Sequence, residues 1–477
     1  MSTILTGLHW QGIQAKLGAP VPIYSLIVLR VCLGLLAAWE CLLLMASGSL
    51  TAMFVEPQVL FPYYGLTWVR PLPGSGIYLH FLVTLIAAAA MASGLFYRFS
   101  TAVFCVGWTW FWLLDQSYYQ NHAYLISLLA GMLVFMPGNG ALALDNLIAP
   151  RTRRRSAPAW TLYLLRAQLG IVYLYAAFAK FSPDWLQGEP MRGLVQNSLA
   201  GFPALGQPIV VEGLTYALSY GGLVFDLLVV PGLLWRPTRP YAFAAAVGFH
   251  LANSQLFHID IFPWLAMSAT TLYFAPDWPL RVAGKLGWVR AQTGAKHEPG
   301  APHTPLSRRA CVILAIYLAV QCLLPFRHLL YPGDHNWTEE GQQLSWFLMA
   351  RSKSGQSIFL VHDPASGKKW KVDPQEYLHP RQAASVAKHP DMIWQFAQFI
   401  VKRMEQQGIP GVEVRAHVPC MLNNRKPALL VDPERNLAAE KRRLFSHYDW
   451  IMPHPGALKG GQDAGAAKLP VGETDLE

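Results

Sequence analysis

Lys180 and the residues that follow it are the first candidates for chemistry in this sequence. The lysine ends an apolar helical stretch, LLRAQLGIVYLYAAFAK, and is followed by Phe181, Pro183, Asp184 and Trp185. An amine held in an apolar pocket loses hydration that stabilises its ammonium form, so it can serve as a base near neutral pH. The position equally suits a lysine whose ammonium group extends to the membrane surface from a helix end. Both interpretations stay open on spacing alone.

Two further polar clusters lie at the ends of apolar segments. His122, with Asn121 beside it, opens one segment within DQSYYQNHAYL and suits either an interfacial residue or part of a site. A later segment, FHLANSQLFHIDIF, places several polar side chains at membrane depth, where each needs a hydrogen-bond partner. Packing alone explains such a density poorly. The polar residues of this cluster are His250, Asn253, Ser254, Gln255 and His258.

Four charged residues lie inside apolar segments, where a charge costs at least about 2.5–3.5 kcal/mol at a helix centre. Arg30 and Glu40 fall in the first segment, and we expect a structural partner or a water-filled cavity for each. Arg166 and Asp226 fall in two later segments. Each suits a structural ion pair or an anchor for an anionic ligand equally well.

Long apolar segments dominate the first 330 residues. The chain has 477 residues, 53% of them hydrophobic and only 14% charged, whereas soluble domains have about 25% charged residues. A membrane-spanning helix needs about 20 mostly apolar residues, and the first segment is too long for a removable signal peptide. We predict a polytopic α-helical membrane protein with about nine transmembrane helices, at about 23–46, 76–97, 100–115, 122–137, 159–179, 209–235, 241–257, 261–276 and 309–330.

The positive charges between these segments predict the orientation. With nine spans and a cytoplasmic N-terminus, most Lys and Arg residues of the segments that precede or connect the spans fall on the inner side, including the RTRRR run that begins at Arg151, whereas the outer connections hold only Arg70, Lys180 and Arg192. The net charge of +10 then follows from topology and does not indicate nucleic-acid binding. The segments predicted to face the outside are 115–122, 180–208, 257–261 and everything after about 331.

The cysteines and histidines do not show a metal-binding spacing. Of the 6 cysteines, only Cys420 lies in the polar part of the chain, and no CxxC motif occurs. We therefore interpret the cysteines as small buried hydrophobes and predict no stoichiometric metal in the bundle.

The C-terminal part has the composition of a soluble domain. QSIFLVHDPASGKKWKV predicts a hairpin of two strands, residues 391–407 carry a helical apolar stripe that Gly408 ends, and GVEVRAHVP and PALLV indicate further strands. The predicted parts of the chain are an N-terminal inner or interfacial segment at 1–22, a transmembrane helical bundle at 23–330, a small extracytoplasmic α+β domain at 331–455 and a disordered tail at 456–477.

Several of these motifs resemble the vitamin K-dependent gamma-carboxylase family, whose bacterial relatives are called HTTM proteins. YLYAAFAKFSPDWLQG and GFHLANSQLFHIDIFPWLAMSATTLYFAPDWP are similar to family segments in which a lysine precedes an acidic-Trp turn and an NSQLF run closes a later helix. QSYYQNHAYLISLL and HNWTEEGQQLSWFLMARSKS are also similar to family segments. The resemblance covers roughly residues 115–435.

The resemblance implies an enzyme that couples oxygenation of vitamin K hydroquinone by O2, which yields the epoxide, to carboxylation of glutamate residues with CO2. It implies that Lys180 is the base that deprotonates the hydroquinone and that His122 serves the carboxylation step. The expected partners are a lipid-soluble quinone, membrane lipid and, where carboxylation holds, a secreted glutamate-containing peptide or protein. The candidate pocket residues, some from the resemblance and some from the residue pattern, are Asn121, Arg166, Asp184, Trp185, His250, Asn253, Ser254 and Gln255.

The sequence also departs from the animal enzymes of that family. Their C-terminal region is much longer, and part of it holds the propeptide of the substrate. Two alternatives therefore stay open: a quinone epoxidase without peptide carboxylation, and a non-catalytic membrane scaffold of the same fold. The presence of Lys180 and His122 at matching positions argues against the scaffold.

Overall fold

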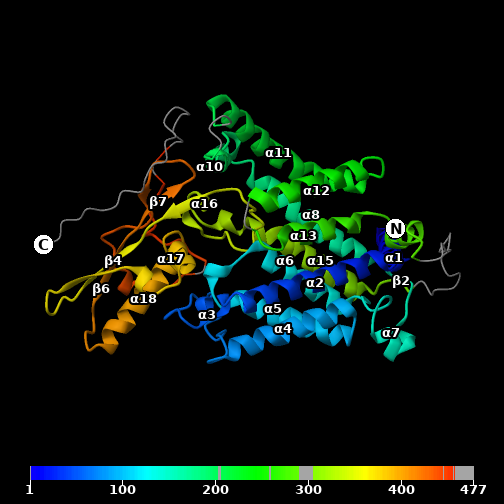
Figure 1. The fold of residues 1–477 in the computed structure, drawn as a ribbon, viewed down its shortest axis with the longest axis horizontal. Helices are drawn as coiled ribbons and strands as arrows, with labels where there is room; N and C mark the ends of the chain where they lie inside the picture. Colours follow the sequence, from blue (N-terminus) through cyan, green and yellow to red (C-terminus); the bar gives the residue numbers. More distant parts are fainter. Residues whose placement is uncertain are drawn as a thin grey trace.

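A helical bundle and a C-terminal α+β domain lie end to end in the computed structural model (Figure 1). The structure describes residues 2–201, 206–256, 259–288, 304–443, 445–454 and 456, with the backbone alone for 2–9 and 256. His258 and, apart from Gly456, the predicted disordered tail lie outside the described residues. The N-terminal helix lies at the end of the bundle remote from the α+β domain (Figure 1).

Each of the nine predicted spans is occupied by a helix in the described part of the chain. Five helical segments are long and apolar enough to cross a membrane, Tyr24–Ala46, Gly76–Ser93, Ala159–Ala179, Pro208–Leu234 and Arg308–Leu330. The polytopic helical architecture is thus confirmed, whereas the count of nine crossings stays a prediction. The helices are α2 (Tyr24–Ala46), α4 (Gly76–Ser93), α5 (Tyr97–Leu113), α6 (Asn121–Phe135), α8 (Ala159–Ala179), α11 (Pro208–Leu234), α12 (Arg239–Leu256), α13 (Phe262–Thr270) and α15 (Arg308–Leu323).

Short elements connect these helices, and α13 is itself too short to cross about 30 Å of hydrocarbon at about 1.5 Å per residue. It continues as η3 (Thr271–Tyr273). The N-terminal helix α1 (Ser2–Gly18) precedes the first span, and the other short elements are β1 (Pro20–Pro22), α3 (Ser49–Phe54), η1 (Gln116–Tyr118), α7 (Asp145–Ile148), η2 (Pro150–Thr152), β2 (Ser156–Pro158), α9 (Pro183–Leu186), α10 (Met191–Leu199), α14 (Trp278–Lys285) and η4 (Leu324–Leu330).

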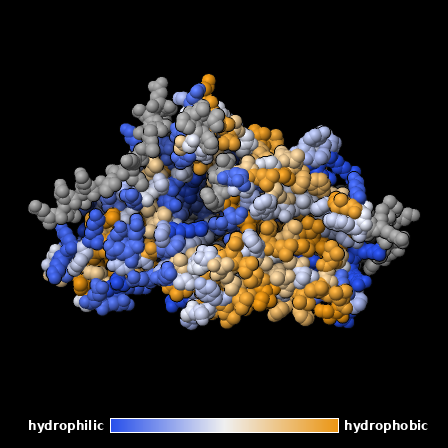
Figure 2. Space-filling model, in the orientation of Figure 1, coloured by the Kyte–Doolittle hydropathy of each residue, from blue (hydrophilic) through white to orange (hydrophobic). Residues whose placement is uncertain are grey.

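The bundle surface carries an apolar belt between two polar ends. Figure 2 shows hydrophobic residues over the bundle helices and hydrophilic residues over the α+β domain and at the opposite end. Inside the bundle, Arg30 has the structural partners that its position required, because its Nη1 donates to the carbonyl of Gly138 at 2.9 Å and its Nη2 to that of Leu142. Glu40 lines a cavity of about 530 Å³ that also contains Asp260.

The α+β domain confirms the predicted hairpin and the amphipathic helix. Strand β4 (Ile358–His362) pairs with both β5 (Lys369–Val372) and β6 (Glu413–His417) in an antiparallel sheet, and the apolar stripe of α18 (Pro390–Gln406) is buried. The remaining elements are α16 (His335–Thr338), β3 (Lys353–Gly355), η5 (Pro374–Glu376), α17 (Pro380–Val386), β7 (Pro419–Leu422), β8 (Ala428–Leu429) and η6 (Leu437–Ala439), and a second antiparallel sheet has the order β3-β7-β8.

The two parts are joined by hydrogen bonds to the loops at one end of the bundle. The side chain of Gln382 donates to the buried carboxylate of Asp115 at 2.7 Å, and Arg442 donates to the carbonyl of Pro62 at 2.8 Å. Asp115 also accepts from the backbone amide of Ser117 at 2.7 Å. The C-terminal domain therefore holds the loop that leads into α6.

Candidate active site

A cavity of about 760 Å³ lies at the end of the bundle that faces the C-terminal domain. Its walls come from α6, α8 to α13 and residues 348–349 of the C-terminal domain, and most of the lining side chains are apolar. A volume of this size suits one organic molecule of moderate size, and a few convergent polar groups would orient it. Its ionisable or amide-bearing lining residues are Gln120, Asn121, His122, Tyr173, Lys180, Asp226, His250 and Asn253.

Lys180 caps the C-terminal end of α8 and points into this cavity. Its side chain is only 5% exposed, so it does not extend to the membrane surface. The amine donates to the carboxylate of Asp226 at 2.8 Å, to the carbonyl of Leu348 at 3.1 Å and to that of Ala176 at 3.2 Å. Three acceptors therefore match the three N–H donors of an ammonium group. The ring of Trp185 lies 5.1 Å from the same nitrogen.

Asp226, for which the sequence allowed either an ion pair or an anchor for an anionic ligand, is the ion-pair partner of Lys180. It lies on α11, it is buried, and its carboxylate lines the cavity beside Lys180. Of the two interpretations that its position allowed, the structure places it in an ion pair. A charge at membrane depth was the only indication in the sequence, and it did not identify the partner.

His122 and Asn121 occupy the first turn of α6, so they reach the cavity from a different helix than Lys180. Asn121 accepts a hydrogen bond from the hydroxyl of Tyr119 at 2.9 Å, and the ring of His122 lies 6.1 Å from that of Phe262. Both residues line the cavity, as does Trp185. The loop before α6 is the one that the C-terminal domain holds, so docking of that domain positions these side chains.

His250 lies on α12 and presents an unsatisfied nitrogen. Its Nε2 hydrogen-bonds the hydroxyl of Tyr173 at 2.9 Å, whereas its buried Nδ1 has no partner among the described residues. Buried polar atoms are rarely left unpaired, so a ligand atom is a natural partner here. Asn253 also lines the cavity, but Ser254 and Gln255 do not, because one bonds the carbonyl of Leu251 and the other is exposed.

Arg166 and Asp184 lie outside the cavity wall and have structural partners. Arg166 donates to the carbonyls of Leu272 at 2.8 Å and Phe274 at 3.0 Å, where η3 ends. Asp184 accepts from Asn423 at 2.6 Å and pairs with Arg425, so it joins the bundle to the C-terminal domain. The structure therefore brings six of the predicted site residues together at the cavity and four elsewhere. The six are Asn121, His122, Lys180, Trp185, His250 and Asn253.

A strap from the C-terminal domain, residues 340–350, contacts the bundle and forms part of the cavity wall. Trp346 is buried and stacks on Tyr124 with ring centroids 4.9 Å apart, and Met349 and Leu348 line the cavity. Leu344, Trp346 and Met349 have positive φ angles of 61°, 59° and 51°. Such backbone conformations persist in non-glycine residues only where the surroundings determine them, and they gather at functional sites.

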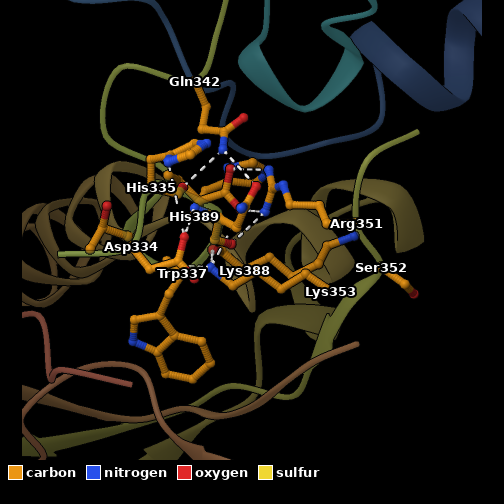
Figure 3. Close-up of polar contacts among 12 residues, drawn as sticks. Asp334, His335, Trp337, Gln342, Arg351, Ser352, Lys353, Lys388 and His389 are labelled. Atoms are coloured by element: carbon orange, nitrogen blue, oxygen red, sulfur yellow. Dashed lines mark hydrogen bonds and ion pairs between the residues drawn. The ribbon is translucent and has the colours of Figure 1, made fainter. Parts of the chain in front are cut away.

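A buried charge cluster fastens the two ends of the strap. Glu339 and Arg351 flank it and form a two-pronged ion pair, and Lys353 lies 3.3 Å from the same carboxylate. Arg351, Lys353 and His389 point toward one centre in Figure 3. Burial alone would raise the pKa of Glu339, but Arg351, His389 and Lys353 outweigh it and hold that pKa well below its ordinary value. Burial lowers the pKa of His389 to about 4, so the cluster keeps a neutral histidine at pH 7.

We expect Glu339→Gln to destabilise the C-terminal domain by roughly 3–5 kcal/mol at pH 7, because it leaves buried cations unpaired. A carboxylate with a lowered folded-state pKa contributes stability above its unfolded pKa of about 4, and that contribution is lost as the pH falls further. The difference between variant and parent should therefore shrink below about pH 4. Thermal unfolding of the full chain at several pH values measures both effects.

Glu413→Gln is the matched control for this variant. Glu413 is a third exposed and pairs with Arg415 on the same strand. Its loss should change stability by no more than about 0.5 kcal/mol. Equal stability of Glu339→Gln and the parent protein at pH 7 would show that the charge cluster does not hold the strap.

Two known protein families match this chain, and together the matches cover most of its length. The family description "HTTM domain" matches residues 19–278, which is more than half of the chain, and includes the bundle helices that line the cavity, from α6 to α12. The description "Vitamin K-dependent gamma-carboxylase, lumenal domain" matches residues 306–457, which include the strap. No solved structure matches the chain. The protein therefore belongs to the vitamin K-dependent gamma-carboxylase family, with a membrane-embedded HTTM domain followed by a lumenal domain.

Proposed function

We propose that this protein is an integral membrane enzyme that couples oxygenation of vitamin K hydroquinone to carboxylation of glutamate residues with CO2. The observation that carries the proposal is the position of Lys180, whose amine is buried in an apolar cavity between the bundle and the lumenal domain. A base in such a place meets a lipid-soluble substrate from the bilayer and a peptide from the lumenal side.

The cavity suits a reduced naphthoquinone. Aromatic and aliphatic side chains such as Phe225, Phe249 and Leu218 offer an apolar surface for a fused ring and its tail. The two hydroxyl groups of the ring need polar partners, and both Lys180 and His250 line the cavity, where Nδ1 of His250 has no partner among the described residues. When bound, the reduced quinone and O2 would supply the strong base that removes a proton from glutamate.

The residues of this chain would then divide the work. Lys180 accepts the proton of a bound hydroxyl, and the apolar walls exclude water from the reacting atoms. His122 and Asn121 lie at the first turn of α6, where a glutamate side chain from the lumenal side would meet them. The strap covers Lys180 from that same side, since the carbonyl of Leu348 bonds its amine.

Purified protein incubated with vitamin K hydroquinone, bicarbonate and a glutamate-rich peptide tests the proposal. The epoxide and carboxyglutamate are scored separately. Formation of both supports the coupled reaction, and epoxide alone would assign the chain to quinone epoxidation without peptide carboxylation. Formation of neither would contradict the proposed function.

We also propose that the N-terminus is cytoplasmic and that the chain crosses the membrane nine times. A cysteine in place of Ala365, in the exposed turn between β4 and β5, should react with an impermeant thiol reagent from the outside. A cysteine in place of Lys285, at the exposed end of α14, should react only after permeabilisation. The native cysteines are replaced in both proteins. Labelling of the Lys285 position in intact cells would invert the topology.

A further inference from the structure

The carboxylate of Asp226 is the direct partner of the proposed base. Its Oδ2 lies 2.8 Å from the amine of Lys180, and the two side chains are only 6% and 5% exposed. Among the described residues, Lys180 is the one polar partner of this carboxylate. A buried carboxylate with a single partner retains capacity to accept a proton, because its remaining lone pairs are unused.

The hydrogen bonds of Lys180 leave no lone pair on the amine. Each of its three donors faces an acceptor, the carboxylate of Asp226 and the carbonyls of Ala176 and Leu348. A group that is to accept a proton needs a free lone pair, so this amine must first give up one of its own protons. A peptide carbonyl does not take up a proton under these conditions, whereas a carboxylate does. Asp226 is therefore the group in contact with the amine of Lys180 that can accept its proton.

We propose that Lys180 and Asp226 act as one base, with Asp226 storing the proton that the reaction releases; this inference rests on the proposed function. The O–H bond of the bound hydroxyl breaks and leaves its electron pair on that oxygen, while the proton joins the amine of Lys180. At the same time one N–H proton of Lys180 passes to Oδ2 of Asp226. The amine stays an ammonium group, the carboxylate becomes a neutral acid, and the total charge of the site is unchanged.

The other titratable groups around the pair make no hydrogen bond to it among the described residues, although Tyr173 lies within electrostatic range of Asp226. Tyr173 on α8 and His250 on α12 line the cavity but bond each other at 2.9 Å, and His122 on α6 packs against Phe262. The lining residues that α10 and the strap contribute carry no titratable side chain. Asp226 is thus the titratable partner of Lys180 within the part of the chain that the structure describes.

Infrared difference spectroscopy without O2 tests the proton transfer itself, because no oxygenation occurs under those conditions. Addition of vitamin K hydroquinone to the full-length protein should produce the C=O band of a protonated carboxylic acid. That band should be absent in Asp226→Asn, which has no acid to form, and in Lys180→Ala, which has no relay. A spectrum without the band in the parent protein, or with it in either variant, would overturn the proposal.

The pH profile of epoxidation provides an independent readout that a merely structural role would not move. The pair can accept a proton as long as the carboxylate is ionised. An isolated amine, in contrast, is protonated, and so unable to accept a proton, over a much wider pH range. Asp226→Asn should therefore shift the acid limb to higher pH, with a loss of at least about tenfold at pH 6 and partial recovery at pH 9. Asp226→Glu should restore the parent limb.

The outcomes separate this inference from the proposed function. If epoxidation by Asp226→Asn is slower by the same factor at every pH, Asp226 has a structural role only. If the acid side of the pH profile moves to lower pH instead, Asp226 hinders Lys180 from acting as a base. Either result overturns the inference while epoxidation that depends on Lys180 still stands. A parent protein that forms no epoxide fails the proposed function, and the inference falls with it.

Discussion

Lys180→Ala is expected to lower the epoxidation rate by about 10²–10⁴-fold, the usual loss when one general base is removed. The amine is buried in the cavity and bonded to Asp226, so the substitution removes the group that would take the hydroxyl proton and leaves the apolar walls in place. Carboxylation should fall equally, because it depends on the oxygenated quinone. The measurement is epoxide formation by the purified protein at saturating hydroquinone.

Two companion experiments separate loss of the base from loss of the fold. Lys180→Arg keeps a cation beside Asp226 but should be no more active than Lys180→Ala, because a guanidinium does not release a proton and so can neither become a free base nor pass a proton to Asp226. A small exogenous amine should restore part of the activity of Lys180→Ala, more so at higher pH as the amine loses its proton. A Lys180→Ala protein that inserts, folds and oxidises hydroquinone at the parent rate would show that Lys180 is not the base.

The helices were predictable from the sequence because membrane insertion imposes a local rule. About 20 apolar residues in a row form a helix in a bilayer, whatever the rest of the chain does. The same holds for the stripe of α18 and for the hairpin of β4 and β5, whose periodicity is local. An apolar sequence does not distinguish a helix that crosses the membrane from one that is only buried in the bundle. For this reason α13 was predicted as a span, although it is too short to cross alone.

The partners of the charged residues could not be predicted, because they depend on tertiary contacts. Asp226 lies 46 positions from Lys180 on another helix, and the carbonyl of Leu348 lies 168 positions away in the other domain. Arg166 was predicted as a pocket residue, yet its acceptors are backbone carbonyls, which leave no mark in a sequence. Asp184 likewise belongs to the predicted pocket but pairs with a domain that lies far along the chain.

The strap explains how two domains can share one site. Its tip stacks Trp346 on Tyr124 of α6 and offers the carbonyl of Leu348 to Lys180, while the ion pair of Glu339 and Arg351 closes its base. Neither the bundle nor the lumenal domain completes the surroundings of the amine alone. The strap therefore connects the lumenal domain to Lys180 through a conformationally constrained segment.

His122→Ala is expected to uncouple the two reactions. Carboxylation should fall by about 10²-fold or more, the loss typical of one acid–base group, whereas epoxidation should stay near the parent rate because the contacts of Lys180 are unchanged. The ring of His122 lies at the first turn of α6 and packs on Phe262, so alanine removes a cavity-lining group without touching the ion pair with Asp226. The ratio of carboxyglutamate to epoxide measures the effect.

His417→Ala is the matched control for this variant, since His417 is exposed on β6 of the lumenal domain, and it should leave the ratio unchanged. His122→Gln should keep part of the carboxylation if hydrogen bonding to the glutamate is the role of the ring, and none if the ring moves a proton. Equal loss of both products in His122→Ala would place His122 in hydroquinone binding or oxygenation instead. Asn121, the other polar lining residue in the first turn of α6, would then be the candidate for the carboxylation step.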